Sequence, residues 1–158
     1  PLDFARSQGA YTIGLACNKD ALLSSRADLS IIPVVGPEVL SGSTRMKAGT
    51  ATKMVLNMLS TGAMVQMGKT YGNLMVDMNA TNVKLTERAK RIVVTLTELS
   101  NEKVAELLKT SGGEVKTAIV MHRLDLSPEQ ARSSLQAARG HLRRALETGV
   151  RTNGNGKS

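Results

Sequence analysis

Residues 35–50 read Val35-Gly36-Pro37-Glu38-Val39-Leu40-Ser41-Gly42-Ser43-Thr44-Arg45-Met46-Lys47-Ala48-Gly49-Thr50. An almost continuously apolar run, residues 29–35, leads into this loop, and a long helical pattern follows it. Such a run is typical of a strand covered on both faces of a parallel sheet, which predicts an α/β fold. Hydroxyls and backbone N–H groups at a helix N-terminus favour a phosphate there. An ordinary capped helix start is the alternative, because Ser and Thr are common caps.

Two segments ahead of this loop complete one strand–helix–strand unit. We expect a strand over residues 11–17 and a short helix over residues 20–26, before the strand at 29–35 and a long helix over 44–67. The helical spacing predicts one stripe along the long helix, apolar except for its last member, formed by Ala51, Met54, Val55, Met58, Leu59, Gly62, Ala63 and Gln66. Two strands alone would expose unpaired backbone groups at both edges. Because the chain also begins with Pro1 rather than Met, we expect it to be a fragment of a longer protein.

The remaining sequence predicts helices. Thr81 can cap a helix reaching Leu99, and Asn101 can cap the next. A further helix is expected over 115–124, after a Ser-Gly-Gly break. Ser127, followed by Pro128 and an acidic residue, is a strong start signal for another. Gly140 separates that helix from a last one ending near Glu147, followed by a polar, glycine-rich tail that we expect to be disordered.

Several ordered blocks give the chain a family resemblance. Residues 36–51 resemble the signature of N-acetylmuramic acid 6-phosphate etherases, and four later blocks agree at the right intervals: residues 55–62, 71–77, 80–85 and 116–121. The match is to the second half of such proteins. A similar Ser-Gly-Ser loop occurs in the glucokinase regulatory protein, a related sugar-phosphate binder, but the longer blocks favour the etherases.

The resemblance implies an architecture. We expect the C-terminal part of a sugar-isomerase-type (SIS) three-layer α/β sandwich with parallel strands, followed by a small helical region. The implied division is a phosphosugar-binding part over residues 1–80, a helical region over 81–150 and a disordered tail over 151–158.

Candidate site residues lie on the loop and at one later helix. Glu38 follows a strand end, where open α/β sheets bind ligands, although a surface loop glutamate is the alternative. The resemblance implies that Ser41, Gly42 and Ser43 line a sugar-phosphate pocket. Lys116 begins a helix, where a cation opposes the helix dipole, so an anionic partner and a solvated lysine are equally good explanations.

The resemblance also implies a reaction. The D-lactyl ether of N-acetylmuramic acid 6-phosphate would be cleaved by elimination and hydration, in amino-sugar recycling from the cell wall. The products would be N-acetylglucosamine 6-phosphate and D-lactate, formed with no metal or organic cofactor. The acid/base glutamates of the family lie in its first half, so the catalytic residues stay unknown and the fragment alone is expected to be inactive. A homodimer is expected for the full-length protein, and a non-catalytic sugar-phosphate-binding regulator is the alternative.

The composition of the chain indicates which classes of partner it is expected to bind. The net charge is +8, but only three aromatic residues occur, fewer than a stacking surface for single-stranded nucleic acid normally needs. We therefore expect neither nucleic acid nor membrane as a partner, although a nucleic-acid-binding helical module stays open. Cys17, the only cysteine, lies in an apolar run and reads as a buried structural thiol. No apolar run approaches the length of a membrane span, so a cytoplasmic location is expected.

Overall fold

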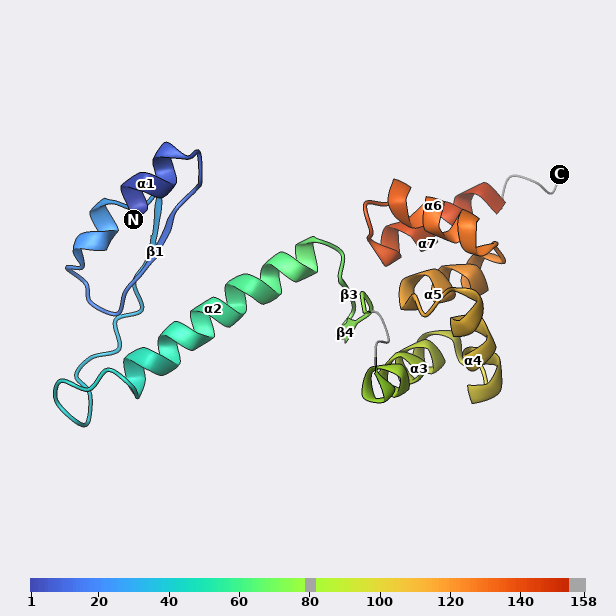
Figure 1. Ribbon diagram of the computed structural model, residues 1–158, viewed down its shortest axis with the longest axis horizontal. Coiled ribbons are helices and arrows are strands. Elements are labelled where there is room, and N and C mark those ends of the chain that lie inside the picture. Colours follow the sequence, from blue (N-terminus) through green and yellow to red (C-terminus); the bar gives the residue numbers. More distant parts are fainter. Residues whose placement is uncertain (79–81, 154–158) are drawn as a thin grey trace. The chain divides into compact units, whose positions relative to one another are not determined.

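The computed structural model describes residues 1–78 and 82–153. They divide into two compact units, Pro1–Thr61 and Gly62–Ser158, and each unit is described here by itself. The division falls inside the long helix α2 (Lys47–Gln66), which is drawn in green in Figure 1. The domain boundary expected at residue 80 lies within the second unit and stays a prediction.

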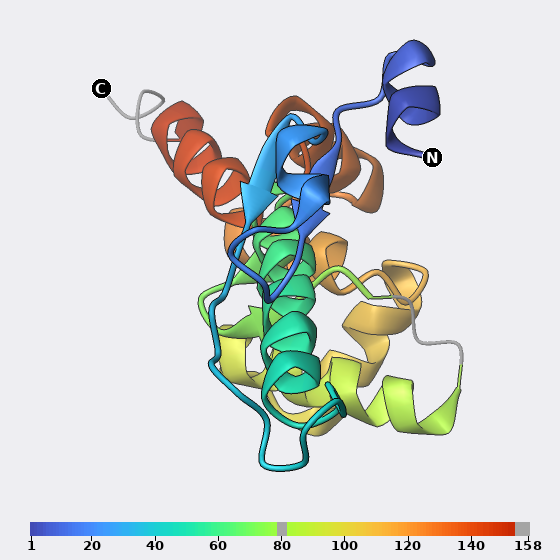
Figure 2. The same cartoon turned by 90° about the vertical axis from the view of Figure 1, so that its left-hand side faces the viewer.

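The first unit confirms the expected α/β class. After α1 (Leu2–Ser7), strands β1 (Ile13–Leu15) and β2 (Leu29–Ile31) pair in parallel, with Gly14 opposite Ser30, and lie side by side in Figure 2. Both strands are shorter than the apolar runs suggested. The short helix expected over residues 20–26 is a 3-10 helix, η1 (Leu22–Ser25). It packs so closely on β1 that a side chain at Gly14 would come within 2.8 Å of Leu23.

Asp28 links the two strands next to their N-terminal ends. Its Oδ2 accepts hydrogen bonds from the Thr12 backbone N–H at 2.8 Å and from the Thr12 hydroxyl at 2.7 Å. Arg6 lies 3.2 Å from the other carboxylate oxygen. The hydrogen bonds from Thr12, helped by the charge of Arg6, hold the pKa of Asp28 below its ordinary value. The carboxylate is therefore ionised at neutral pH and ties α1 and β1 to the start of β2.

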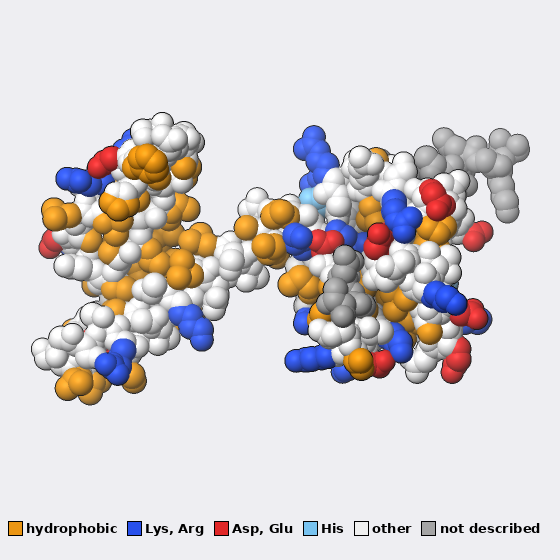
Figure 3. Space-filling model, viewed as in Figure 1, with side chains coloured by type: hydrophobic (Ala, Val, Ile, Leu, Met, Phe, Trp, Pro, Cys, Tyr) orange, Lys and Arg blue, Asp and Glu red, His pale blue; other side chains and the backbone are white. Residues whose placement is uncertain are grey.

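Helix α2 is much longer than the sheet beside it. Its 20 residues span roughly 30 Å, whereas a strand of three residues spans roughly 10 Å. Val55 is the one buried residue on α2, although the sequence predicts a continuous apolar stripe along this helix. Met54, Met58 and Leu59, all on that stripe, are 57%, 61% and 40% exposed. Hydrophobic side chains accordingly gather on the face of the first unit seen in Figure 3.

We expect this exposed stripe to make the isolated chain associate with itself, because contiguous apolar surface is stabilised by removal from water. In sedimentation velocity, the apparent mass should rise with protein concentration. Met58→Glu should reduce this association, and Asn57→Glu, an exposed polar position on the same helix, should not. A clean monomer at all concentrations would contradict the prediction.

The second unit is a helical bundle with a small hairpin. Strands β3 (Thr70–Tyr71) and β4 (Leu74–Met75) pair in an antiparallel hairpin that the sequence analysis missed. The helices are α3 (Val83–Thr97), α4 (Asn101–Thr110), α5 (Val115–Leu124), α6 (Pro128–Ala137) and α7 (Leu142–Asn153). Helix α5 packs against the other four helices, among which it lies in Figure 1. It contributes more buried core residues than any other described element. Its buried residues include Val115, Ala118, Ile119 and Val120.

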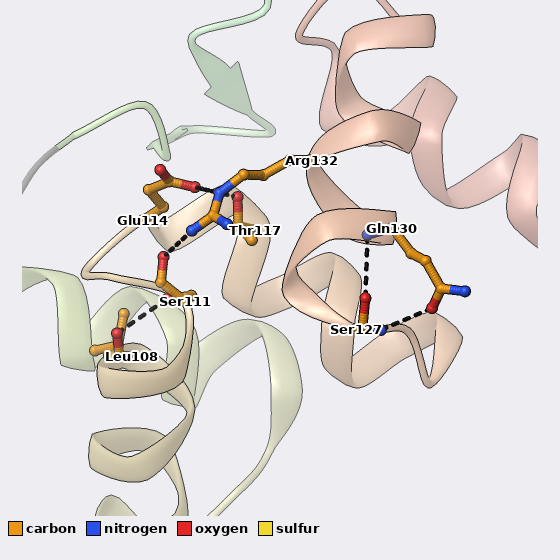
Figure 4. A network of polar contacts seen from close by, with 7 residues as sticks. All are labelled: Leu108, Ser111, Glu114, Thr117, Ser127, Gln130 and Arg132. Carbon is orange, nitrogen blue, oxygen red and sulfur yellow. Dashed lines mark hydrogen bonds and ion pairs between the residues drawn. The ribbon is translucent and has the colours of Figure 1, made fainter.

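Local signals account for most of these helix ends. Ser127 caps α6, as predicted. The structure adds a capping box with Gln130, whose two bonds of 3.2 Å and 2.9 Å Figure 4 shows. The prediction that Asn101 caps α4 is wrong, because Ser100 is the cap and Asn101 is the first helical residue. Asn82 caps α3; Thr81, the cap predicted from the sequence, lies outside the described residues.

The last helix runs further than expected. Helix α7 ends at Asn153 rather than near Glu147, so the first three positions of the predicted 151–158 tail are helical. Residues 154–158 lie outside the described part of the chain. Among the helices that are described, none is long and apolar enough to cross a membrane.

Candidate functional site

A hollow of about 560 Å³ lies at the C-terminal end of β1, where ligands bind in open α/β sheets. Three segments of the first unit meet there: the end of β1, the loop before α2 and the first turns of α2. The lining residues are Leu15, Ala16, Cys17, Asn18, Val35, Gly36, Glu38, Thr44, Ala48, Gly49 and Thr52. The sequence prediction of a ligand position next to Glu38 thus coincides with a concave surface.

Glu38 lines this hollow and caps helix α2 from nine residues upstream. Its two carboxylate oxygens accept the backbone N–H groups of Lys47 and Ala48, both at 3.0 Å. The Lys47 ammonium donates to the Pro37 carbonyl at 2.9 Å and fixes the same loop. The bonds from Ala48 and Lys47 hold the pKa of Glu38 below its ordinary value. Glu38 is therefore a charged acceptor that orders the helix start, and its contact with a ligand stays a prediction.

Ser41, Gly42 and Ser43 form a tight turn in the loop. Gly42 has φ +82°, a left-handed conformation that favours glycine, and the Ser43 N–H donates to the Leu40 carbonyl at 3.1 Å. The Ser43 hydroxyl accepts a 3.0 Å bond from Arg45 Nε. None of the three residues lines the hollow, which the neighbouring Thr44 does. Glu38 takes the capping role that the alternative reading gives to these serines, and their role in binding stays a prediction.

Cys17 is a lining residue that the sequence analysis missed. Its thiol is half-buried, 3.6 Å from the Ala48 carbonyl oxygen and 3.7 Å from the Thr52 hydroxyl. The sequence predicted a strand that ends at Cys17 and a buried structural thiol, but β1 ends at Leu15 and the thiol is half-buried at the hollow. The position at the end of the predicted strand is the signal that could have placed Cys17 among the candidate residues.

Lys116 lies in the second unit and is not a solvated lysine. Its ammonium is 2.7 Å from Asp77 Oδ1 and donates to the Gly140 carbonyl at 3.1 Å, with 15% of the side chain exposed. It lines a separate cavity of about 330 Å³. The other lining residues are Lys69, Val76, Asp77, Met78, Glu114, Thr117 and Leu135. Asp77 therefore offsets the unfavourable free energy of a cation at the start of α5. No spacing in the sequence indicated this pairing of Lys116 with Asp77.

The described residues hold no group of three or more His, Cys, Asp or Glu side chains that could bind a metal ion. His122 lies in α5, and His141 directly precedes α7.

Comparison with known proteins confirms the resemblance. The chain is 54% identical over 147 residues to an N-acetylmuramic acid 6-phosphate etherase of Rhodopirellula baltica, a match that covers 93% of the chain. Proteins of that name from Salmonella paratyphi B and Salmonella enteritidis are 54% identical over 146 residues, or 92% of the chain. The chain spans about half the length of these curated relatives, 49% in each case. No family model matches it.

Proposed function

We propose that the chain is one half of an N-acetylmuramic acid 6-phosphate etherase, a carbon–oxygen lyase. The reaction would release D-lactate and N-acetylglucosamine 6-phosphate by elimination followed by addition of water. The observation that carries this proposal is the 54% identity over nearly the whole chain to proteins of that name. The match covers 147 of the 158 residues and therefore contains the loop that carries the candidate site.

In this proposal, the loop over residues 41–44 holds the sugar phosphate. The hydroxyls of Ser41 and Ser43 and the backbone of Gly42 supply donors, and Arg45, bonded to Ser43, adds positive charge beside them. Glu38 takes the backbone N–H groups of Lys47 and Ala48, so the ligand would bind the loop rather than these amides. The fixed helix start would keep the loop in a shape ready for binding, which lowers the entropy cost of binding.

The acid and base of the reaction would come from the other half of the enzyme. Proton abstraction beside a carbonyl needs a carboxylate that is free to accept a proton. Glu38 is a poor candidate because both of its oxygens accept backbone hydrogen bonds that favour the charged form. We further propose that this other half completes a three-layer sandwich around β1 and β2, and that the whole enzyme is a homodimer that needs no metal or organic cofactor.

A regulator that binds sugar phosphates without turnover is the second candidate, supported by the Ser41-Gly42-Ser43 loop alone. The two candidates differ in one measurement. A hybrid protein, in which this chain replaces the matched half of the Rhodopirellula baltica relative, should release D-lactate if the chain belongs to an etherase. A regulator half would bind the sugar phosphate in the hybrid and give no lactate.

In the hybrid, we expect Ser41→Ala and Ser43→Ala each to weaken N-acetylglucosamine 6-phosphate binding without unfolding the protein. A lost hydrogen bond to a charged group costs roughly 1.5–3 kcal/mol, which corresponds to about tenfold to a hundredfold in affinity. Isothermal titration calorimetry gives the affinity, and a thermal melt of each variant gives its stability. Ser60→Ala, on an exposed part of α2, is the matched control. Lowered stability with unchanged affinity would show that the serines only order the loop.

A further inference from the structure

Two lysines share one carboxylate in the second unit. Lys69 Nζ lies 2.7 Å from Asp77 Oδ2, and Lys116 Nζ lies 2.7 Å from Asp77 Oδ1. The three residues come from different places: Lys69 precedes β3, Asp77 follows β4, and Lys116 lies in the first turn of α5. Their side chains are only 32%, 31% and 15% exposed. Withdrawing an ammonium from water is unfavourable without a counter-charge, and one carboxylate compensates only one of the two lysines.

The second carboxylate of the same cavity is already engaged. Glu114 accepts a 2.9 Å bond from Arg132 Nε and a 2.7 Å bond from the Thr117 hydroxyl. Arg132 also donates to the Ser111 carbonyl at 3.1 Å, as Figure 4 shows. Among the residues that the structure describes, Lys69, Lys116 and Arg132 pair with two carboxylates, Asp77 and Glu114, which leaves one positive charge in excess at the cavity.

The two ammonium groups also have N–H donors for which the described residues supply no acceptor. A lysine has three N–H donors. Among the described residues, Lys116 donates to Asp77 and to the Gly140 carbonyl, and Lys69 donates to Asp77. One N–H of Lys116 and two of Lys69 remain for another acceptor. The cavity of about 330 Å³ that both lysines line has the volume of a small-molecule site.

Asp77 is suited to hold the lysines in place. Burial raises the pKa of Asp77, but the hydrogen bonds from Lys116 and Lys69 outweigh this effect and bring the pKa below its ordinary value. The carboxylate is thus charged at neutral pH and binds one ammonium with each oxygen. A charged acceptor between two flexible side chains restricts both to one geometry.

We propose that Lys69 and Lys116 form a two-lysine receptor for a phosphate group in the second unit, with Asp77 as the residue that positions both ammonium groups. The proposal rests on the proposed function only for the source of the phosphate, a phosphorylated amino sugar. The receptor itself is argued from the excess charge, the spare donors and the cavity. Inorganic phosphate presents the same chemistry and is the simplest probe.

The test uses the whole chain, titrated with inorganic phosphate, N-acetylglucosamine 6-phosphate and unphosphorylated N-acetylglucosamine. Two-dimensional NMR follows the backbone amides of Thr117 and Gly140, so binding in the second unit is separated from binding at the 41–44 loop. We expect both phosphates to shift these amides and the unphosphorylated sugar to leave them unchanged. Lys69→Gln should weaken phosphate binding about tenfold or more. Lys109→Gln, at an exposed position on α4, should leave it unchanged.

The Asp77→Asn variant distinguishes two roles of Asp77, positioning the two lysines or simply repelling the anionic ligand. Removing a negative charge near an anion site should strengthen phosphate binding if Asp77 only repels the ligand. If Asp77 positions the lysines, Asp77→Asn should weaken binding, and Lys69→Arg should retain much of the affinity that Lys69→Gln loses. A thermal melt of each variant checks that it is folded. Stronger binding by Asp77→Asn would overturn the positioning role.

Other outcomes bear on the receptor and the etherase function separately. Unchanged phosphate affinity in a destabilised Lys69→Gln variant would make the lysine pair a purely structural contact and overturn the receptor. An inactive hybrid whose Thr117 and Gly140 amides still respond to phosphate would contradict the etherase function and leave the receptor standing. An active hybrid in which phosphate shifts neither amide would support the etherase function and overturn the receptor.

Discussion

The isolated 158-residue chain should release no measurable D-lactate from N-acetylmuramic acid 6-phosphate, whereas the hybrid with the unmatched half of the Rhodopirellula baltica relative should turn over. General acid and base groups each contribute about 10²–10⁴-fold to a rate, so an enzyme half without them loses most of its activity. In this chain the carboxylate that lines the hollow, Glu38, is held by two backbone N–H groups. A coupled lactate dehydrogenase assay specific for the D-isomer measures the release.

Two controls make this comparison decisive. The unmatched half of the relative, expressed alone, shows whether the hybrid gains activity from this chain or already had it. Mixing the two separate halves shows whether they must be covalently joined. Turnover by the isolated chain would contradict the prediction and would require a catalytic acid or base among its own residues.

Ile119→Ala should strongly destabilise the second unit. Ile119 is 1% exposed on α5, the helix that packs against α3, α4, α6 and α7. Truncating a buried isoleucine loses the transfer free energy of the removed atoms and leaves a cavity, which together cost about 2–5 kcal/mol. That is a large share of the roughly 5–15 kcal/mol that stabilises a typical domain. Urea unfolding followed by far-ultraviolet circular dichroism should show a lower midpoint for the variant.

Leu56→Ala on α2 is the matched control for this core substitution. Leu56 is 54% exposed, so its truncation should change the free energy of unfolding by about 0.5 kcal/mol or less. The contrast separates the loss of core packing in the helical bundle from a general effect of truncating a large apolar side chain. Equal losses from the two substitutions would show that Leu56 is buried in solution.

Local chemistry made much of this structure predictable from the sequence. Ser127, Pro128 and the acidic residue after them indicated the start of α6, because a cap, an N1 proline and a charge that suits the helix dipole act within one turn. The Ser-Gly-Gly break placed the start of α5 at Val115. Apolar runs before the 35–50 loop indicated parallel strands, and β1 and β2 pair in that way. The loop blocks also identified the etherase resemblance, which the 54% identity confirms.

Long-range contacts decided the rest. The sequence predicted a ligand position beside Glu38, but only the fold showed the hollow there and the Glu38 carboxylate bonded to Lys47 and Ala48. The partner of Lys116 is 39 positions away (116 − 77), and no periodicity joins such residues. Helix spacing likewise predicted an apolar stripe on α2. Whether the side chains of that stripe are buried depends on which other segments pack against α2. Capping and periodicity act over a few residues, so the sequence alone determined the starts of α5 and α6 and the parallel type of the strand pair. Ion pairs, cavities and exposed faces arise when distant segments pack, so only the tertiary structure decided them.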